Sequence, residues 1–130
     1  MISREDIESY LIRTDLDYEE IGEGMWLVRP EDQEESSGPA IVASYLPPVL
    51  LLRTVIREVP DGDEAQLRIF RRLLELNATD LVHGAYGLED GEIVLADTLE
   101  LESLDFNEFR ASLEGLALAV TSHLKDLSAD

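Results

Sequence analysis

The turn pair Asp90-Gly91 lies between two apolar runs, and it constrains the fold of this chain more than any other feature. Glycine accepts the positive φ that tight turns require, so the pair predicts a β-hairpin in the C-terminal half. The first strand of this hairpin is thin on both faces, because it carries Gly84, Ala85 and Gly87. Small strand residues often allow another backbone to approach closely. We therefore expect a helix to lie across this part of the sheet.

Three segments have the apolar periodicity of amphipathic helices. Ser3 is the expected N-cap of the first helix. The second is capped by the turn at 61–63 and is expected to end near Asn77, because asparagine tolerates the left-handed conformation that terminates helices. The third begins after Asp105, with Glu108 completing a capping-box pattern.

Four β-rich runs lie between the first two helices. Residues 17–21 and 25–29 predict a hairpin of short strands. Residues 40–46 and 49–59 predict two more strands, divided by Pro47-Pro48, because proline cannot donate to a sheet ladder.

The order of elements is therefore α-β-β-β-β-α-β-β-α. It favours an α+β fold in which helices pack on one face of an antiparallel sheet. At 130 residues, the chain 1–130 is most simply a single domain. The acidic segment 30–39, bounded by prolines, is predicted to be a flexible loop.

The charge of the chain limits its partners. There are 29 acidic and 10 basic residues, which give a net charge of −19 that repels nucleic acid and anionic lipid. The longest apolar run, 47–52, is far too short to span a membrane. The charged N-terminus lacks the apolar core of a signal peptide, and the chain has no cysteine. We expect a location in the bacterial cytoplasm and no binding to nucleic acid or membrane.

Five of the ten cationic residues lie between positions 53 and 72. One interpretation is that these arginines pair with nearby carboxylates. The other is a local contact with an anion or an acidic segment, for which Arg68, Arg71 and Arg72 are the candidates.

Catalytic and metal-binding patterns are missing from the sequence. No serine lies in a G-x-S-x-G elbow, and no glycine-rich phosphate loop opens a helix. His83 and His123 lack the spacing of metal ligands, so we interpret them as ordinary surface or hydrogen-bonded histidines. The acidic run that starts at Asp15 opens like a calcium loop but lacks its glycine and its final glutamate. We predict no catalytic residue, no cofactor and no metal site, and hence no enzyme.

Four large apolar residues are candidates for a dimer or partner contact. Leu67, Phe70 and Leu74 lie on one stripe of the second helix, whose apolar surface is broader than one neighbour needs. They belong either to the core or to a dimer interface. Trp26, the only tryptophan, is either a core residue or a binding hot spot.

Four motifs carry a resemblance to a known family: LLELNA at 73–78, HGAYGL at 83–88, EDG at 89–91 and EIVLADTLEL at 92–101. With the order of elements, they resemble the YbjN-like proteins of bacteria, which share a fold with type III secretion chaperones of the Tir-chaperone class. The resemblance implies a homodimer. Secretion chaperones bind extended segments of client proteins, and the YbjN-like members are described as regulators.

The sequence therefore predicts a non-enzymatic protein-binding module, similar to a type III secretion chaperone, that binds a segment of a partner protein. We expect that segment to be unstructured, apolar and net-basic. The alternative is a bacterial regulatory or sensory module that binds a partner or a small ligand. An exposed apolar groove or a free sheet edge would favour the first function, and a deep, enclosed polar pocket would favour the second.

Overall fold

An antiparallel sheet is the framework of the part of the chain that the structure, a computed structural model, describes: residues 1–29 and 39–128. Within these residues the sheet has six strands in the order β1-β2-β3-β4-β6-β5. The strands are β1 (Asp17–Gly22), β2 (Met25–Arg29), β3 (Ile41–Leu46), β4 (Val49–Glu58), β5 (Ala85–Glu89) and β6 (Glu92–Glu100). The helices are α1 (Arg4–Thr14), α2 (Asp63–Thr79) and α3 (Phe106–Ser128). The predicted α+β fold and its order of elements are confirmed. Residues 30–38 lie outside the described part, so the loop predicted there stays a prediction.

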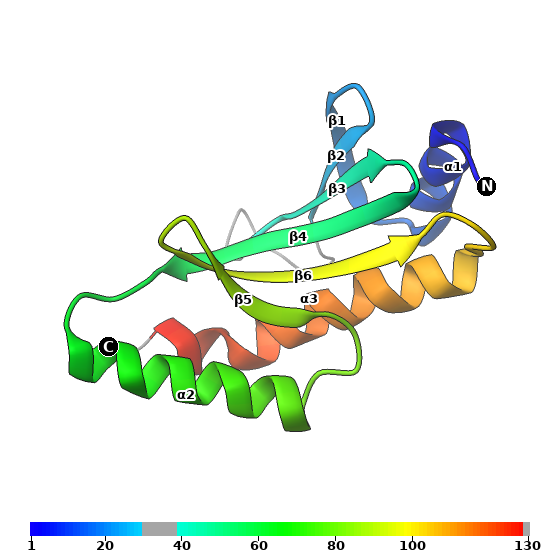
Figure 1. The fold of residues 1–130 in the computed structure, drawn as a ribbon. Coiled ribbons are helices and arrows are strands. Elements are labelled where there is room, and N and C mark those ends of the chain that lie inside the picture. The colour runs from blue at the N-terminus through cyan, green and yellow to red at the C-terminus, as the bar shows by residue number, and fades with distance from the viewer. Residues whose placement is uncertain (30–38, 129–130) are drawn as a thin grey trace.

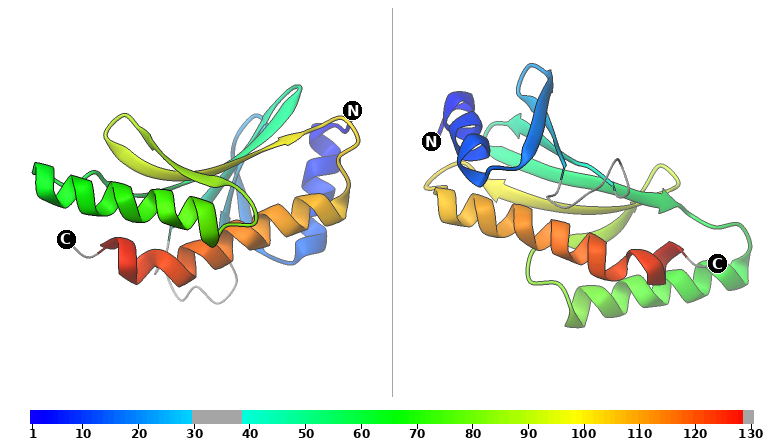
Figure 2. Two further views of the ribbon diagram at one scale, coloured as in Figure 1. Left: turned by 60° about the horizontal axis from the view of Figure 1, so that its bottom comes forward. Right: turned by 180° about the vertical axis from the view of Figure 1, so that it is seen from behind.

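The helices pack along one face of the twisted sheet (Figure 1). The long helix α3 runs beneath the centre of the sheet and contacts β4 and β6, and α2 lies beside the edge strand β5. The short helix α1 packs at the beginning of α3. No helix of residues 1–29 or 39–128 covers the opposite face (Figure 2).

One apolar core joins the sheet to the helices. Strand residues that alternate along β2, β3, β4 and β6 point toward the helices, and the fully buried ones include Val28, Ala43, Leu50, Leu52, Ile93 and Leu95. From α3, Phe109, Leu113 and Leu116 are fully buried against them. Burial of a large apolar side chain contributes about 1.5–3 kcal/mol, so this layer dominates the stability of the fold.

The starts of α1 and α3 follow the predicted caps. The backbone N–H of Asp6 donates to the Ser3 hydroxyl at 3.2 Å, and the backbone N–H of Ser3 donates to the Asp6 carboxylate at 2.9 Å. The hydrogen bonds that the Asp6 carboxylate accepts from Ser3, first of all from its backbone N–H, lower the pKa of Asp6. The N–H of Glu108 donates to Asp105 at 2.8 Å, and the N–H of Asp105 donates to Glu108 at 3.2 Å.

Both ends of α2 differ from the prediction. Gly62 is the N-cap, with a φ of 92°, and no side chain caps the helix there. Instead, the side-chain amide of Gln66 donates to the carbonyl of Pro60 at 2.9 Å. At its other end, α2 continues past Asn77 to Thr79. Asn77 lies inside the helix, and its side chain forms two hydrogen bonds to the backbone of Tyr86 in the next strand.

The β5–β6 hairpin turns at Asp90-Gly91 as predicted, with φ values of 51° and 82°. The first strand begins later than expected, at Ala85. The predicted close approach holds at Gly84, where an added Cβ would lie 2.8 Å from the Ala96 carbonyl oxygen and 2.8 Å from Leu116 Cδ2. It is wrong at Gly87, where an added Cβ would meet nothing within 4 Å.

Candidate partner-binding surfaces

An apolar groove of about 230 Å³ runs between α2 and the edge strand β5. The side chains that line it are Phe70, Leu73, Leu74, Asn77, Tyr86, Gly87 and Leu88. Leu74 is 69% exposed and Leu88 is 55% exposed, and Leu67 on the same helix is 69% exposed. Large apolar side chains that cluster at a surface mark interaction sites more often than single exposed ones do. The structure therefore places two of the three predicted residues of α2 in the lining of this groove, the half-buried Phe70 and the exposed Leu74, whereas Leu67 is exposed on the same helix outside the lining.

Asn77 fixes one wall of this groove. Its side-chain oxygen accepts from the backbone N–H of Tyr86 at 2.8 Å, and its side-chain NH₂ donates to the Tyr86 carbonyl at 3.2 Å. One amide thus replaces the neighbouring strand that β5 lacks at this position. No local pattern in the sequence signals this contact, because nine residues and a change of element separate the two partners.

A chain of hydrogen bonds that is buried at Tyr86 and His123 and reaches the surface at Asp80 lies behind the groove. The Tyr86 hydroxyl and His123 Nδ1 are 2.7 Å apart, and His123 Nε2 lies 3.2 Å from a carboxylate oxygen of Asp80. Burial raises the pKa of Tyr86 to about 12, and the charge of Asp80 adds to this effect. The three residues tie β5, α3 and the end of α2 to one another. His123 is therefore hydrogen-bonded, as the sequence suggested, although it is buried.

The two edges of the sheet differ in their capacity to accept another strand. The N–H and C=O of one residue in an antiparallel strand point to the same side, and the side alternates along the strand. The backbone N–H and C=O of Tyr86 point away from β6 and bond to Asn77. One of the two residues of β5 whose backbone groups face outward is therefore already paired. Among the described residues, β1 has a neighbouring strand on one side only. Strand addition is therefore favoured at β1 over β5.

Trp26 does not belong to the exposed surface. Its side chain is 2% exposed and lies in the core cluster with Val28 and Ile41. Of the two interpretations of Trp26, the core residue agrees with this burial. A binding hot spot exposed on the surface of the protomer does not. The indole nitrogen of Trp26 is nevertheless the one buried side-chain N or O atom without a partner among the described residues.

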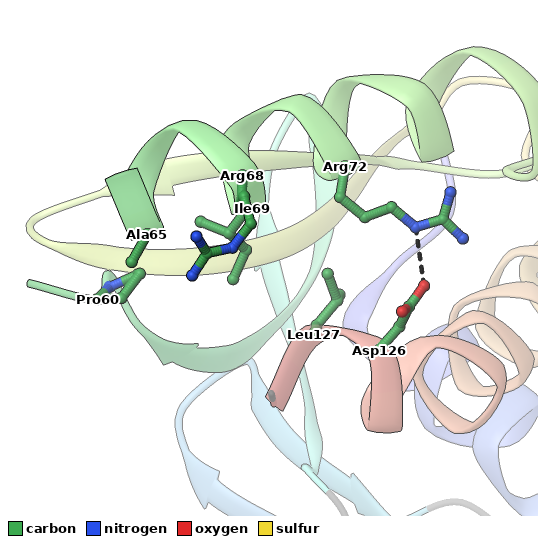
Figure 3. Close-up of a pocket in the computed structure, with 7 residues that line it drawn as sticks. All are labelled: Pro60, Ala65, Arg68, Ile69, Arg72, Asp126 and Leu127. Carbon is green, nitrogen blue, oxygen red and sulfur yellow. Dashed lines mark hydrogen bonds and ion pairs between the residues drawn. The ribbon is translucent and has the colours of Figure 1, made fainter. Parts of the chain in front are cut away.

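The three candidate arginines of α2 do not act as one patch. Arg72 donates to Asp126 at 2.8 Å (Figure 3) and approaches Glu75, and Arg71 lies 3.5 Å from Glu75. The contact with Asp126 raises the pKa of Arg72. Only Arg68 has no ion pair within residues 1–29 and 39–128, and it lies beside a depression of about 200 Å³ that Ala65 and Leu127 also line. Arg71 and Arg72 therefore pair with nearby carboxylates. A contact with an anion stays a proposal for Arg68.

Groups that could hold a metal ion do not gather anywhere in the described part of the chain. No three acidic or histidine side chains within it are placed to hold a metal ion. No helix in this part is long and apolar enough to cross a membrane. The surface features that remain are grooves and sheet edges, which suit contacts with other proteins.

The comparison with protein-family models gives a match to CesT_Tir_1, a type III secretion chaperone family, over residues 2–129. The chain belongs to the CesT_Tir_1 family. Proteins of this family are non-enzymatic chaperones, so the chain is not an enzyme and its role is a chaperone-like one in protein binding. No curated protein matches the chain by sequence.

Three solved structures show how widely this fold is shared. The heterodimeric complex ExoU–SpcU from the type III secretion system of Pseudomonas aeruginosa contains a chain that matches with a TM-score of 0.69 and 19% identity, over 92% of this chain and 95% of that one. YbjN from E. coli, a candidate transcription regulator, matches with a TM-score of 0.63 and 13% identity, over 94% and 91%. The complex of the Yersinia pestis type III secretion chaperone SycH with a fragment of YscM2 matches with a TM-score of 0.60 and 13% identity, over 92% and 98%. The predicted relation to YbjN and to the secretion chaperones is confirmed.

Proposed function

We propose that this CesT_Tir_1 protein is a homodimeric, chaperone-like protein of the bacterial cytoplasm that holds a segment of a partner protein. The observation that carries the dimer is the apolar groove between α2 and β5, whose lining residues Leu74 and Leu88 are more than half exposed, with the exposed Leu67 on the same helix. The open edge of β1 supports the contact with the partner segment. The structural neighbours ExoU–SpcU and SycH–YscM2, each a complex of two proteins, support it.

The groove suits a helical partner better than a strand. Asn77 already occupies the outward backbone groups of Tyr86, so an added strand would find only one free pair in β5, at Leu88. A second copy of α2 would instead offer the same leucines at helical spacing, in the symmetric arrangement that two-fold dimers use. We assign the groove to the dimer contact and the open edge of β1 to the partner segment.

Light scattering tests the dimer. At physiological salt and micromolar concentration we expect twice the protomer mass of 14.6 kDa. Each protomer carries −19, so low salt should weaken the dimer, because the charges at its rim are then screened less. A monomer mass at physiological salt would contradict the proposal.

A matched pair of variants locates the contact. Leu67→Asp with Leu74→Asp should give a folded monomer. Ile12→Asp with Leu118→Asp adds the same charge at residues that are 63% and 67% exposed, and should leave the dimer intact. If both pairs dissociate the protein, added charge is the cause and the groove is not the interface.

The client is tested by capture from the native cell followed by mass spectrometry. We expect an extended, apolar, net-basic protein segment, because the acidic surface speeds encounter with basic chains while apolar contacts supply the affinity. Raising salt should slow association strongly and change dissociation little. Capture of DNA instead of protein would contradict both the charge argument and the proposal.

A regulatory module is the second candidate, because YbjN, a candidate transcription regulator, shares the fold. In that function the protein binds a regulatory partner or a small ligand without holding an extended client. Capture of one folded partner in place of extended segments would favour it.

A further inference from the structure

The face of the sheet that turns away from the helices is apolar at its centre. No helix of residues 1–29 or 39–128 covers it (Figure 2). The register of the strands places on this face the residues that alternate with those of the core, among them Met25, Leu27, Val42, Leu46, Leu51 and Val55. Met25 is 38% exposed and Leu46 is 52% exposed, and the other four are half-buried. We call this surface the open face, and contiguous apolar surfaces of this kind mark interaction sites.

One ion pair covers part of the open face. Arg53 on β4 reaches Glu89 on β5 at 2.8 Å and thereby crosses β6, the strand between them, at Val94. Val94 is 7% exposed for this reason, although no helix in the described part of the chain lies over it. Ion pairs between partly exposed side chains contribute little stability, so a bound molecule can displace this one. Beside Val94, Gly87 leaves a notch, because an added Cβ there would meet nothing within 4 Å.

A row of acids borders the open face at one end. Glu58, Glu92 and Glu89 are direct neighbours across β4, β6 and β5. Like charges directly opposite one another destabilise a sheet. Of the three, only Glu89 has an ion pair within residues 1–29 and 39–128. A cationic group of a partner would therefore relieve a repulsion at this end of the face.

We propose that the open face binds an amphipathic, net-basic helix of the partner segment. The strands β2, β3, β4 and β6 each have a neighbour on both sides, so the face has no free backbone N–H or C=O to offer. A chain that is desolvated against it must satisfy its own backbone groups, and a helix does so. The apolar stripe of that helix packs on Leu51 and Val55, and its cationic side chains reach Glu58 and Glu92.

A second copy of this protein fits the open face less well than a basic helix does. It would bring the same acids into contact with one another. The two arginines of the face cannot compensate for them, because Arg29 is paired with Glu19 and Arg53 with Glu89. A surface of anionic lipid would be repelled in the same way. Charge complementarity therefore favours a basic partner.

The inference rests on the proposed function and adds a second contact for the same partner segment. The edge strand β1, to which we assign that segment, lies next to β2 in the sheet. A segment that adds to β1 needs only to leave this edge to continue across the open face. It would be extended at the edge and helical on the face.

Methyl resonances of leucine and valine test the binding directly. The probe is the peptide Ac-Leu-Lys-Lys-Leu-Leu-Lys-Leu-Leu-Lys-Lys-Leu-Leu-Lys-Leu-NH₂, whose leucines form one helical stripe. We expect it to shift the methyl resonances of Leu51, Val55 and Val94 and to leave those of Leu74 and Leu88 in the α2 groove unchanged. A scrambled peptide of the same composition has no stripe and should bind at least about tenfold more weakly.

Two triple variants separate the open face from the rest of the apolar surface. The face variant carries threonine, which suits a strand, at three half-buried positions: Leu27→Thr, Leu51→Thr and Val55→Thr. The control changes exposed apolar residues elsewhere: Ile12→Gln, Val82→Thr and Leu118→Gln. We expect the face variant to bind the peptide at least about tenfold more weakly and the control to change binding less than about twofold. Thermal unfolding shows whether each variant is folded.

Two double variants of equal net charge test the row of acids, and neither changes a packed side chain. Glu58→Gln with Glu92→Gln should weaken peptide binding by about threefold to tenfold, the size expected when two exposed ion pairs are lost. Glu64→Gln with Glu114→Gln removes the same charge at exposed positions elsewhere and should change binding less than about twofold.

Three outcomes would overturn the inference: methyl resonances of the open face that stay fixed at saturating peptide, equal binding of the scrambled peptide, or equal losses in the two double variants. A captured client that binds the wild type and the folded face variant equally would overturn the open face and leave the proposed function standing. Failure of the proposed function has a different signature, a monomer that captures no client at all.

Discussion

Replacing Asn77 by alanine tests the most specific contact behind the α2 groove. The change deletes two hydrogen bonds and leaves the N–H and C=O of Tyr86 without partners, in a residue that is 6% exposed. Each unsatisfied buried group costs about 1–3 kcal/mol. Asn77 itself is half-buried, so water can replace part of the loss. We expect the free energy of unfolding to fall by about 2–3 kcal/mol in total.

Urea denaturation at one fixed protein concentration measures this loss, since stability depends on concentration if the protein is a dimer. Asn77→Asp is the matched control: it keeps the acceptor for the Tyr86 N–H but has no donor for the Tyr86 carbonyl, so it should cost about half as much. Hydrogen exchange of the Tyr86 amide should accelerate in the alanine variant and much less in the aspartate variant. A loss below about 0.5 kcal/mol, with the Tyr86 amide still protected, would refute the reasoning.

Two further predictions concern stability at neighbouring positions. Burial raises the pKa of Tyr86 to about 12 in the folded protein, whereas the pKa is near 10 in the unfolded chain. The contribution of neutral Tyr86 to the free energy of unfolding is therefore complete below pH 10 and is lost between pH 10 and 12. Across this range the free energy of unfolding should fall by up to about 2.7 kcal/mol more in the wild type than in Tyr86→Phe. In thermal unfolding, Gly84→Ala should lower the stability by more than about 2 kcal/mol, because its Cβ would lie 2.8 Å from Ala96 and from Leu116. Gly91→Ala places a Cβ at a similar positive φ but in open space, so it should cost only about 1 kcal/mol. Equal losses in the two glycine variants would show that backbone strain alone matters.

The features that the sequence predicted correctly depend on neighbours a few residues away. The caps at Ser3 and Asp105 bond to residues three positions along, and the Asp90-Gly91 turn connects adjacent strands. Helix and strand order follows from local periodicity, so the fold class was accessible. For Leu67 and Leu74 the sequence left the core and a dimer interface as alternatives, and in the structure both side chains are exposed on the protomer.

The features that the sequence could not supply depend on distant partners. Asn77 has a local tendency to end a helix, but its bonds to Tyr86 compensate for keeping it helical. Trp26 gives no local sign that its ring is buried while its N–H lacks a partner. The row of acids on the open face comes from β4, β6 and β5, and only the register of the sheet brings them together.

The hydrogen bonds from the Asn77 side chain to the edge strand β5 also limit how copies of this protein can assemble. A sheet with two open edges can add strands at both ends without limit, and this is how fibres grow. Because Asn77 uses one of the two outward backbone pairs of β5, the described sheet lengthens more readily at β1, and one added strand, whether a client strand or a second β1, occupies that edge. If β1 accepts the partner segment, as proposed, that one addition occupies the open edge of the described sheet, and the complex has a defined end.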